Sequence, residues 1–90
     1  MSDKEGEDTT DSRLKAYISR ELVKDPKVLP LENNTHLLES SILDSLSLLR
    51  LVLFIEEQFH VTISPNELIP KNFETVNAIC ALIEAKKGTH

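Results

Sequence analysis

The sequence predicts an all-α fold, a small four-helix bundle with three main helices, one short helix and a long first loop. Its 90 residues are the length of one domain, and a chain of this size buries roughly 60% of its unfolded surface. Apolar residues recur at helical spacing in separate stretches, and residues typical of helix N-termini precede them. Two glycines are few, which disfavours a turn-rich β-sandwich.

The two ends of the chain are expected to lie outside this bundle. Residues 1–11 contain no large apolar residue after Met1, and they carry five acidic residues against one basic residue. Low hydropathy and high charge predict a disordered acidic tail. The folded domain is therefore expected at 12–86, followed by a frayed C-terminus at 87–90.

The first helix is expected to begin after Asp11 or Ser12, either of which can cap it, and to end before Pro26. Its predicted core face consists of Leu14, Tyr17, Ile18 and Leu22. The connection at 25–44 is long for a compact domain. It still carries apolar residues that we expect on the core, namely Leu29, Leu31, Leu37, Leu38, Ile42 and Leu43.

Three further helices are predicted from their N-terminal signals. The second main helix is expected at about 45–60. The stretch SPNE at 64–67 is a capping-box signature for a short third helix that ends before Pro70. Thr75 can cap the last helix, whose predicted core face consists of Val76, Ile79, Cys80 and Ile83.

Charge and composition exclude several functions. The net charge of −5 argues against binding to nucleic acid or to an anionic membrane surface. The apolar run after Ser45 is interrupted by Arg50 and is too short to span a membrane. One cysteine allows neither an intrachain disulfide nor a thiolate zinc site. With no signal-peptide pattern at the start, a cytoplasmic location is expected.

The helix expected at 45–60 has more apolar residues than one core stripe needs. At about 100° per residue, one arc collects the predicted core residues Leu48, Leu51, Val52, Ile55 and Phe59. A different arc collects Leu46, Leu49 and Leu53. This second stripe is either buried, as in a central helix that is apolar nearly all round, or exposed as a partner site.

Asp44 and Ser45 stand at the expected N-terminus of this helix. Free backbone N–H groups and the helix dipole favour an anion there, so a phosphate on the Ser45 hydroxyl would be stabilised. The plainer interpretation is that one of the two residues is only an N-cap.

Three motifs in order resemble the phosphopantetheine-bearing carrier proteins, the acyl carrier proteins and their relatives. They are DSL at 44–46, FIEEQF at 54–59 and FETVNAI at 73–79, with the short capped helix between the last two. The resemblance covers about 13–84 and implies the family's small four-helix carrier-protein bundle.

The resemblance also implies a function. Ser45 would be the attachment point for 4′-phosphopantetheine, which a phosphopantetheinyl transferase moves from coenzyme A with Mg²⁺ in the transferase site. Asp44 would assist that step, and the chain would be a carrier rather than an enzyme, with no metal of its own. The cofactor's thiol would hold an acyl or aminoacyl group as a thioester. The implied partners are the transferase, an acyl- or aminoacyl-loading ligase and downstream synthase or transferase enzymes, each binding a monomeric carrier.

In this family the second helix docks onto partner enzymes. The implied docking residues are Leu46, Leu49, Arg50, Leu53, Glu56 and Glu57.

The chain departs from the usual fatty-acid carriers near this motif. Those carriers have acids two and five residues after the serine, where this chain has Ser47 and Arg50. An acid is also common where Gln58 stands, and the glycine often found shortly before the motif is absent. These departures favour a specialised pathway, such as polyketide or nonribosomal-peptide assembly or a dedicated aminoacyl carrier. A fatty-acid synthesis carrier is the alternative.

Two other classes of function compete with the carrier. A helical adaptor would keep the fold and the docking face but bear no cofactor. An enzyme could be imagined around Ser45, His36 and His60, but there is no nucleophile-elbow motif and no Gly-rich oxyanion loop. Cys80 is expected to be a small core residue rather than a reactive thiol.

Overall fold

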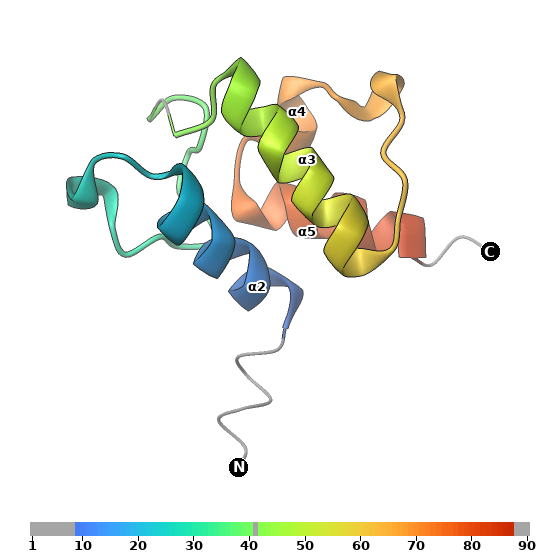
Figure 1. The fold of residues 1–90 in the computed structure, drawn as a ribbon, viewed down its shortest axis with the longest axis horizontal. Helices are drawn as coiled ribbons and strands as arrows, with labels where there is room; N and C mark the ends of the chain where they lie inside the picture. The colour runs from blue at the N-terminus through green and yellow to red at the C-terminus, as the bar shows by residue number, and fades with distance from the viewer. Residues whose placement is uncertain (1–8, 41, 88–90) are drawn as a thin grey trace, which may run out of the picture.

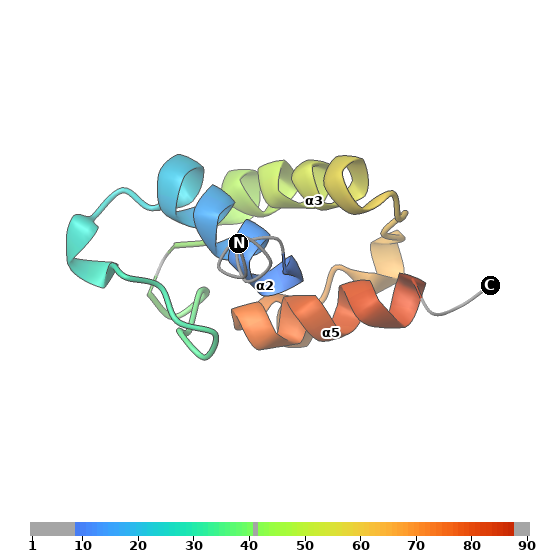
Figure 2. The same ribbon diagram turned by 90° about the horizontal axis from the view of Figure 1, so that it is seen from below.

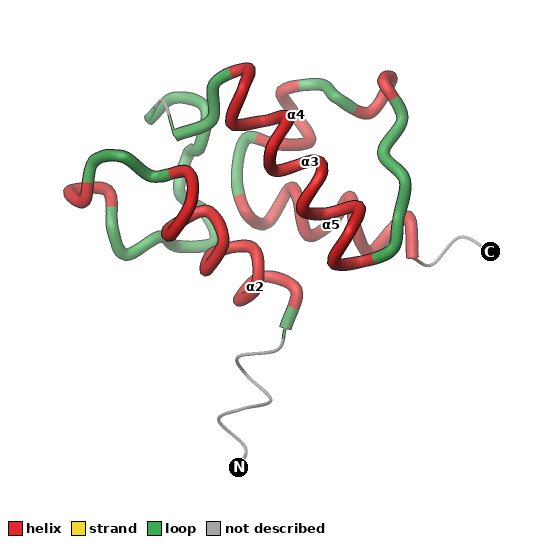
Figure 3. The backbone as a smooth tube through the Cα atoms, viewed as in Figure 1, coloured by secondary structure: helices red, strands yellow, loops and turns green. Residues whose placement is uncertain are grey.

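A computed structural model describes residues 9–40 and 42–87, and this part of the chain contains helices and no strand. The all-α prediction is therefore confirmed (Figures 1 and 3). The α-helices are α2 at Thr10–Tyr17, α3 at Ser45–Phe59, α4 at Pro70–Phe73 and α5 at Val76–Lys87. A π-helical turn at Ile18–Leu22 continues α2, and 3₁₀ turns lie at Pro26–Val28 and Pro65–Glu67. The three main helices are thus α2 with its π-turn, α3 and α5, and α4 is the short one.

The first helix begins earlier than its sequence suggested. Thr9, rather than Asp11 or Ser12, is the N-cap, and its hydroxyl oxygen accepts a hydrogen bond from the Ser12 N–H at 3.3 Å. The hydroxyl of Thr10 donates to a Glu84 carboxylate oxygen on α5 at 3.3 Å. The rest of the expected acidic tail, 1–8, and the C-terminal residues 88–90 lie outside the described residues.

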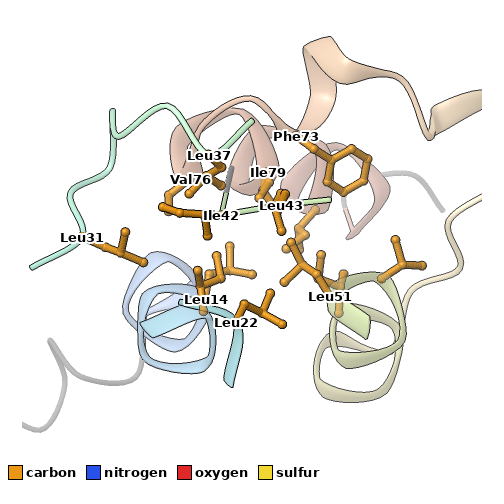
Figure 4. Packing of buried hydrophobic residues seen from close by; sticks show 14 of the residues in the cluster. Leu14, Leu22, Leu31, Leu37, Ile42, Leu43, Leu51, Phe73, Val76 and Ile79 are labelled. Carbon is orange, nitrogen blue, oxygen red and sulfur yellow. The ribbon is translucent and has the colours of Figure 1, made fainter. Parts of the chain in front are cut away.

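The core lies between the three main helices. Figure 4 shows Leu14 and Leu22 from the first helix, Leu51 from α3 and Ile79 from α5 around one common interior. Figure 2 shows α3 and α5 on opposite sides of this interior. Most of the predicted core face of each helix is buried, whereas Tyr17, Leu48 and Cys80 are half-buried at its edge. Burial of one apolar stripe per helix therefore holds the bundle together.

The long loop is fastened to the beginning of α5. The Leu37 N–H donates to the Glu74 carbonyl oxygen at 2.8 Å, and the Asn77 N–H donates to the Asn33 carbonyl oxygen at 2.9 Å. The second bond satisfies one of the donors that a helix N-terminus leaves free. Of the apolar loop residues, Leu31, Leu37, Ile42 and Leu43 are buried and Leu38 is half-buried. Leu29 was wrongly expected on the core, since 39% of it is exposed beside the first 3₁₀ turn.

The segment between α3 and α5 contains two short elements where the sequence suggested one. SPNE does form a capping box, because the Ser64 N–H donates to Glu67 Oε1 at 2.9 Å, but the turn that it opens is 3₁₀. Lys86 on α5 holds the same carboxylate at 2.7 Å. Pro70 then opens α4 at its first position instead of ending the previous helix.

Candidate functional site

Ser45 is the first residue of α3, and it is exposed. The backbone of Asp44 is extended, and its Oδ1 accepts a hydrogen bond from the Ser47 N–H at 2.8 Å. The Asp44 carbonyl oxygen accepts the first helical bond, from the Leu48 N–H at 2.8 Å. Asp44 is therefore the N-cap. The hydroxyl of Ser45 does not cap the helix, and it is open to solvent.

The Asp44 carboxylate is held in its ionised form. The backbone N–H of Ser47 lowers the pKa of this carboxyl most, followed by the Ser47 hydroxyl, and the charge of Lys24 lowers it further. The site thus presents an exposed hydroxyl, a carboxylate fixed in one orientation and a nearby ammonium group. Because the helix N-terminus and Lys24 both favour an anion, a phosphodiester on Ser45 fits the residues present.

Ser47 has a structural role that its sequence position did not reveal. It is only 6% exposed, and both its N–H and its hydroxyl donate hydrogen bonds to the Asp44 carboxylate. An acid at this position would therefore bring a second carboxylate to the cap, where like charges repel.

The second apolar stripe of α3 is exposed. Leu46, Leu49 and Leu53 are 68%, 54% and 57% exposed, and we call them the leucine face. On the other side of the helix, the buried apolar residues are Leu51, Val52, Ile55 and Phe59. The alternative that both stripes are buried is excluded. A group of exposed apolar side chains is typical of a protein-interaction site.

The charged residues expected around the leucine face differ in their contacts. Arg50 Nη2 lies 3.6 Å from the Glu21 Oε1 of the π-helical turn, so the first helix contributes a carboxylate beside α3. Glu57 is exposed and lines a hollow of about 280 Å³ with Arg50, Leu53 and two aromatic residues. Glu56 instead accepts a hydrogen bond from the Ile63 N–H at 2.9 Å, and so it fastens the segment after α3.

Sequence reasoning missed the contribution of the first helix to this site. The rings of Tyr17 and Phe54 stack with their centroids 4.1 Å apart, which fixes the first helix against α3 beside Leu53. Phe54 fell on neither stripe of α3, and an aromatic residue in that position was the available signal. No periodicity within one helix reveals Lys24 or Glu21, since Glu21 meets α3, and the charge of Lys24 reaches Asp44, only through the tertiary fold.

The remaining candidate side chains offer little chemistry. Burial raises the pKa of the Cys80 thiol to about 11, so it is protonated at neutral pH and a poor nucleophile. His60 ends α3 in the left-handed conformation, with φ 56° and ψ 46°. Among the residues that the structure describes, no group of three metal-ligating side chains comes together, and no helix is long and apolar enough to cross a membrane.

The family model for the phosphopantetheine attachment site matches residues 12–83, a segment that contains most of the first helix, all of α3 and most of α5. Over 58 residues the chain is 36% identical to "Probable acyl carrier protein PigG" of Serratia sp. (strain ATCC 39006), a match that covers 64% of this chain and 67% of that relative. The chain therefore belongs to the acyl carrier protein family, whose members are carriers rather than catalysts and bear a covalent 4′-phosphopantetheine.

Proposed function

We propose that Ser45 is the residue that carries 4′-phosphopantetheine, and that the chain shuttles an acyl or aminoacyl group between partner enzymes. The observation that carries the proposal is the exposed Ser45 hydroxyl at the first position of α3, directly after the N-cap Asp44, inside the matched family segment. When bound, the cofactor supplies a terminal thiol on which the cargo is held as a thioester.

The residues around Ser45 support modification by a phosphopantetheinyl transferase. Asp44 stays ionised at neutral pH. One carboxylate oxygen can therefore face the Mg²⁺ of the transferase while Oδ1 remains hydrogen-bonded to the Ser47 N–H. The free N–H groups of the first turn of α3 and the charge of Lys24 favour the anionic product.

The leucine face is the proposed docking surface for the transferase, the loading ligase and the downstream synthase or transferase enzymes. Its exposed side chains are apolar anchors, and Arg50 and Glu57 are charges at the rim. Rim charges chiefly affect encounter rate and partner discrimination. Since Arg50 stands where fatty-acid carriers have an acid, and Ser47 is committed to the cap, the surface favours partners of a specialised pathway. We place this work in the cytoplasm, with the carrier as a monomer.

Intact-mass measurement tests the attachment. Incubation with coenzyme A, Mg²⁺ and a broad-specificity transferase should raise the mass by one phosphopantetheinyl group. The change Ser45→Ala should abolish the increase, and the matched change Ser40→Ala, a nearby exposed serine, should not. An unchanged wild-type mass, with the transferase active on a control carrier, would favour the unmodified helical adaptor.

A further inference from the structure

A hollow of about 290 Å³ lies between the end of the first helix and the segment that enters α3. In Figures 1 and 2 this entering segment passes the end of the first helix just before α3 begins. The residues that line the hollow are Val23, Lys24, Asp25, Val28, Ser40 and Ile42. None of them belongs to the leucine face, so the hollow is separate from the proposed docking surface.

The lining combines an apolar floor with a polar rim. Val23 and Val28 are half-buried and Ile42 is buried, whereas the three polar residues are exposed. Two of the polar groups already have partners. The Asp25 Oδ1 accepts from the Lys27 N–H at 3.0 Å, and the Ser40 hydroxyl donates to the His36 carbonyl oxygen at 2.6 Å.

Lys24 is the cationic residue of the rim. Within residues 9–40 and 42–87 its ammonium group forms no ion pair, although its charge reaches Asp44. A phosphodiester on Ser45 would lie next to the Asp44 carboxylate and would be repelled by it. A nearby cation offsets such repulsion, and Lys24 is placed to supply it.

The hollow is within reach of a group attached to Ser45. Ile42 precedes Ser45 by three residues, so their Cα atoms are at most about 11 Å apart even if the chain is fully extended. The phosphopantetheine arm joins a phosphate, a dimethyl-bearing pantoyl unit and two amide-linked segments before its thiol, and is longer than this separation. Its branched apolar unit matches the apolar floor, and its phosphate matches Lys24 on a rim that also carries the acidic Asp25.

We propose that this hollow is a resting site for the phosphopantetheine arm, in which Lys24 contacts the phosphodiester and Val23, Val28 and Ile42 receive the dimethyl unit. The inference rests on the proposed attachment at Ser45. An arm held here leaves the leucine face open, so a partner enzyme can dock first and draw the arm out afterwards.

Nuclear magnetic resonance of the ¹⁵N-labelled protein, before and after loading with coenzyme A and the transferase, tests the site. Loading should shift the amide signals of Val23, Lys24 and Val28, and it should leave that of Ala81, an exposed residue of α5, in place. The dimethyl protons of the arm should show nuclear Overhauser contacts to the methyl groups of Val28 or Ile42.

A matched pair of lysine variants separates the charge from the general environment. Lys24→Met keeps the stem but removes the ammonium group, and should abolish the Overhauser contacts and change the ³¹P shift of the phosphodiester. Lys27→Met, an exposed lysine of the same segment, should do neither. This inference alone would be overturned by a fully loaded protein in which only the amide signals of residues 44–48 change and the arm makes no contact to Val28 or Ile42. A chain that stays unloaded would overturn the proposed function with it.

Discussion

Replacing Leu53 by alanine should leave the bundle almost as stable as before, while the same change at Leu51 should not. Leu53 is 57% exposed, so less than half of its side chain leaves water on folding. Full burial of a leucine contributes about 1.5–3 kcal/mol, and therefore truncating Leu53 should cost about 1 kcal/mol or less, since alanine also favours the helix. Leu51 has no exposed surface, and its truncation should cost about 2–5 kcal/mol.

The two variants separate docking from stability when both properties are measured. Urea denaturation followed by circular dichroism gives the two free energies of unfolding. The kcat/KM of a broad-specificity transferase gives the effect on a partner, and it should fall for Leu53→Ala because apolar anchors hold such complexes together. A loss of unfolding free energy at Leu53 equal to that at Leu51 would refute the exposed face. Unchanged kcat/KM with an intact fold would refute its role in docking.

Two further results are expected from residues outside the proposed attachment site. His60 holds a left-handed conformation that glycine adopts without strain, so His60→Gly should stabilise the protein by about 0.5–1 kcal/mol and raise its Tm, whereas His60→Ala should not. No rise for the glycine variant would show that the histidine side chain compensates. The thiol pKa of Cys80 is raised to about 11 by burial, so its alkylation by iodoacetamide should be slow at neutral pH and should still be increasing roughly tenfold per pH unit near pH 9.5. A rate that levels off near pH 9 would show that the thiol is open to solvent.

The positions of the main helices could be predicted because their start signals are local. Asp44 and Thr75 both cap the helices that they precede, the latter by accepting from the Ala78 N–H at 3.1 Å. Local signals fail where several equivalent ones adjoin. The run TTDS at 9–12 offers a capping side chain at every position. Thr9 is the one that caps the helix, while Thr10 bonds to Glu84 of α5. Pro70 was misread for a similar reason, since proline both ends helices and opens them.

The site could be predicted only as far as periodicity within α3 extends. The helical arc separated the leucine face from the buried stripe, but whether anything covered that face depended on the path of the long loop. The hydrogen bonds of Ser47 and Glu56 also could not be predicted from the sequence. The first completes the cap, and the second binds the backbone of Ile63 beyond the end of the helix. Side chains committed to such bonds contribute less to a partner surface than their sequence positions suggest.

The leucine face and Ser45, the proposed attachment residue, lie on one rigid element, and this is the physical basis of the proposed shuttle. Buried side chains such as Leu51 and Ile55 fix α3 in the bundle, and Asp44 fixes where the helix begins. A partner that binds the leucine face therefore finds the Ser45 hydroxyl at a constant distance and direction, with no flexible loop between them. Different enzymes can then act on the same arm by recognising the same helix. If the leucine face is the docking surface, the charged rim should govern their discrimination, and since Arg50 is paired with Glu21 there, the first helix should also affect which partners bind.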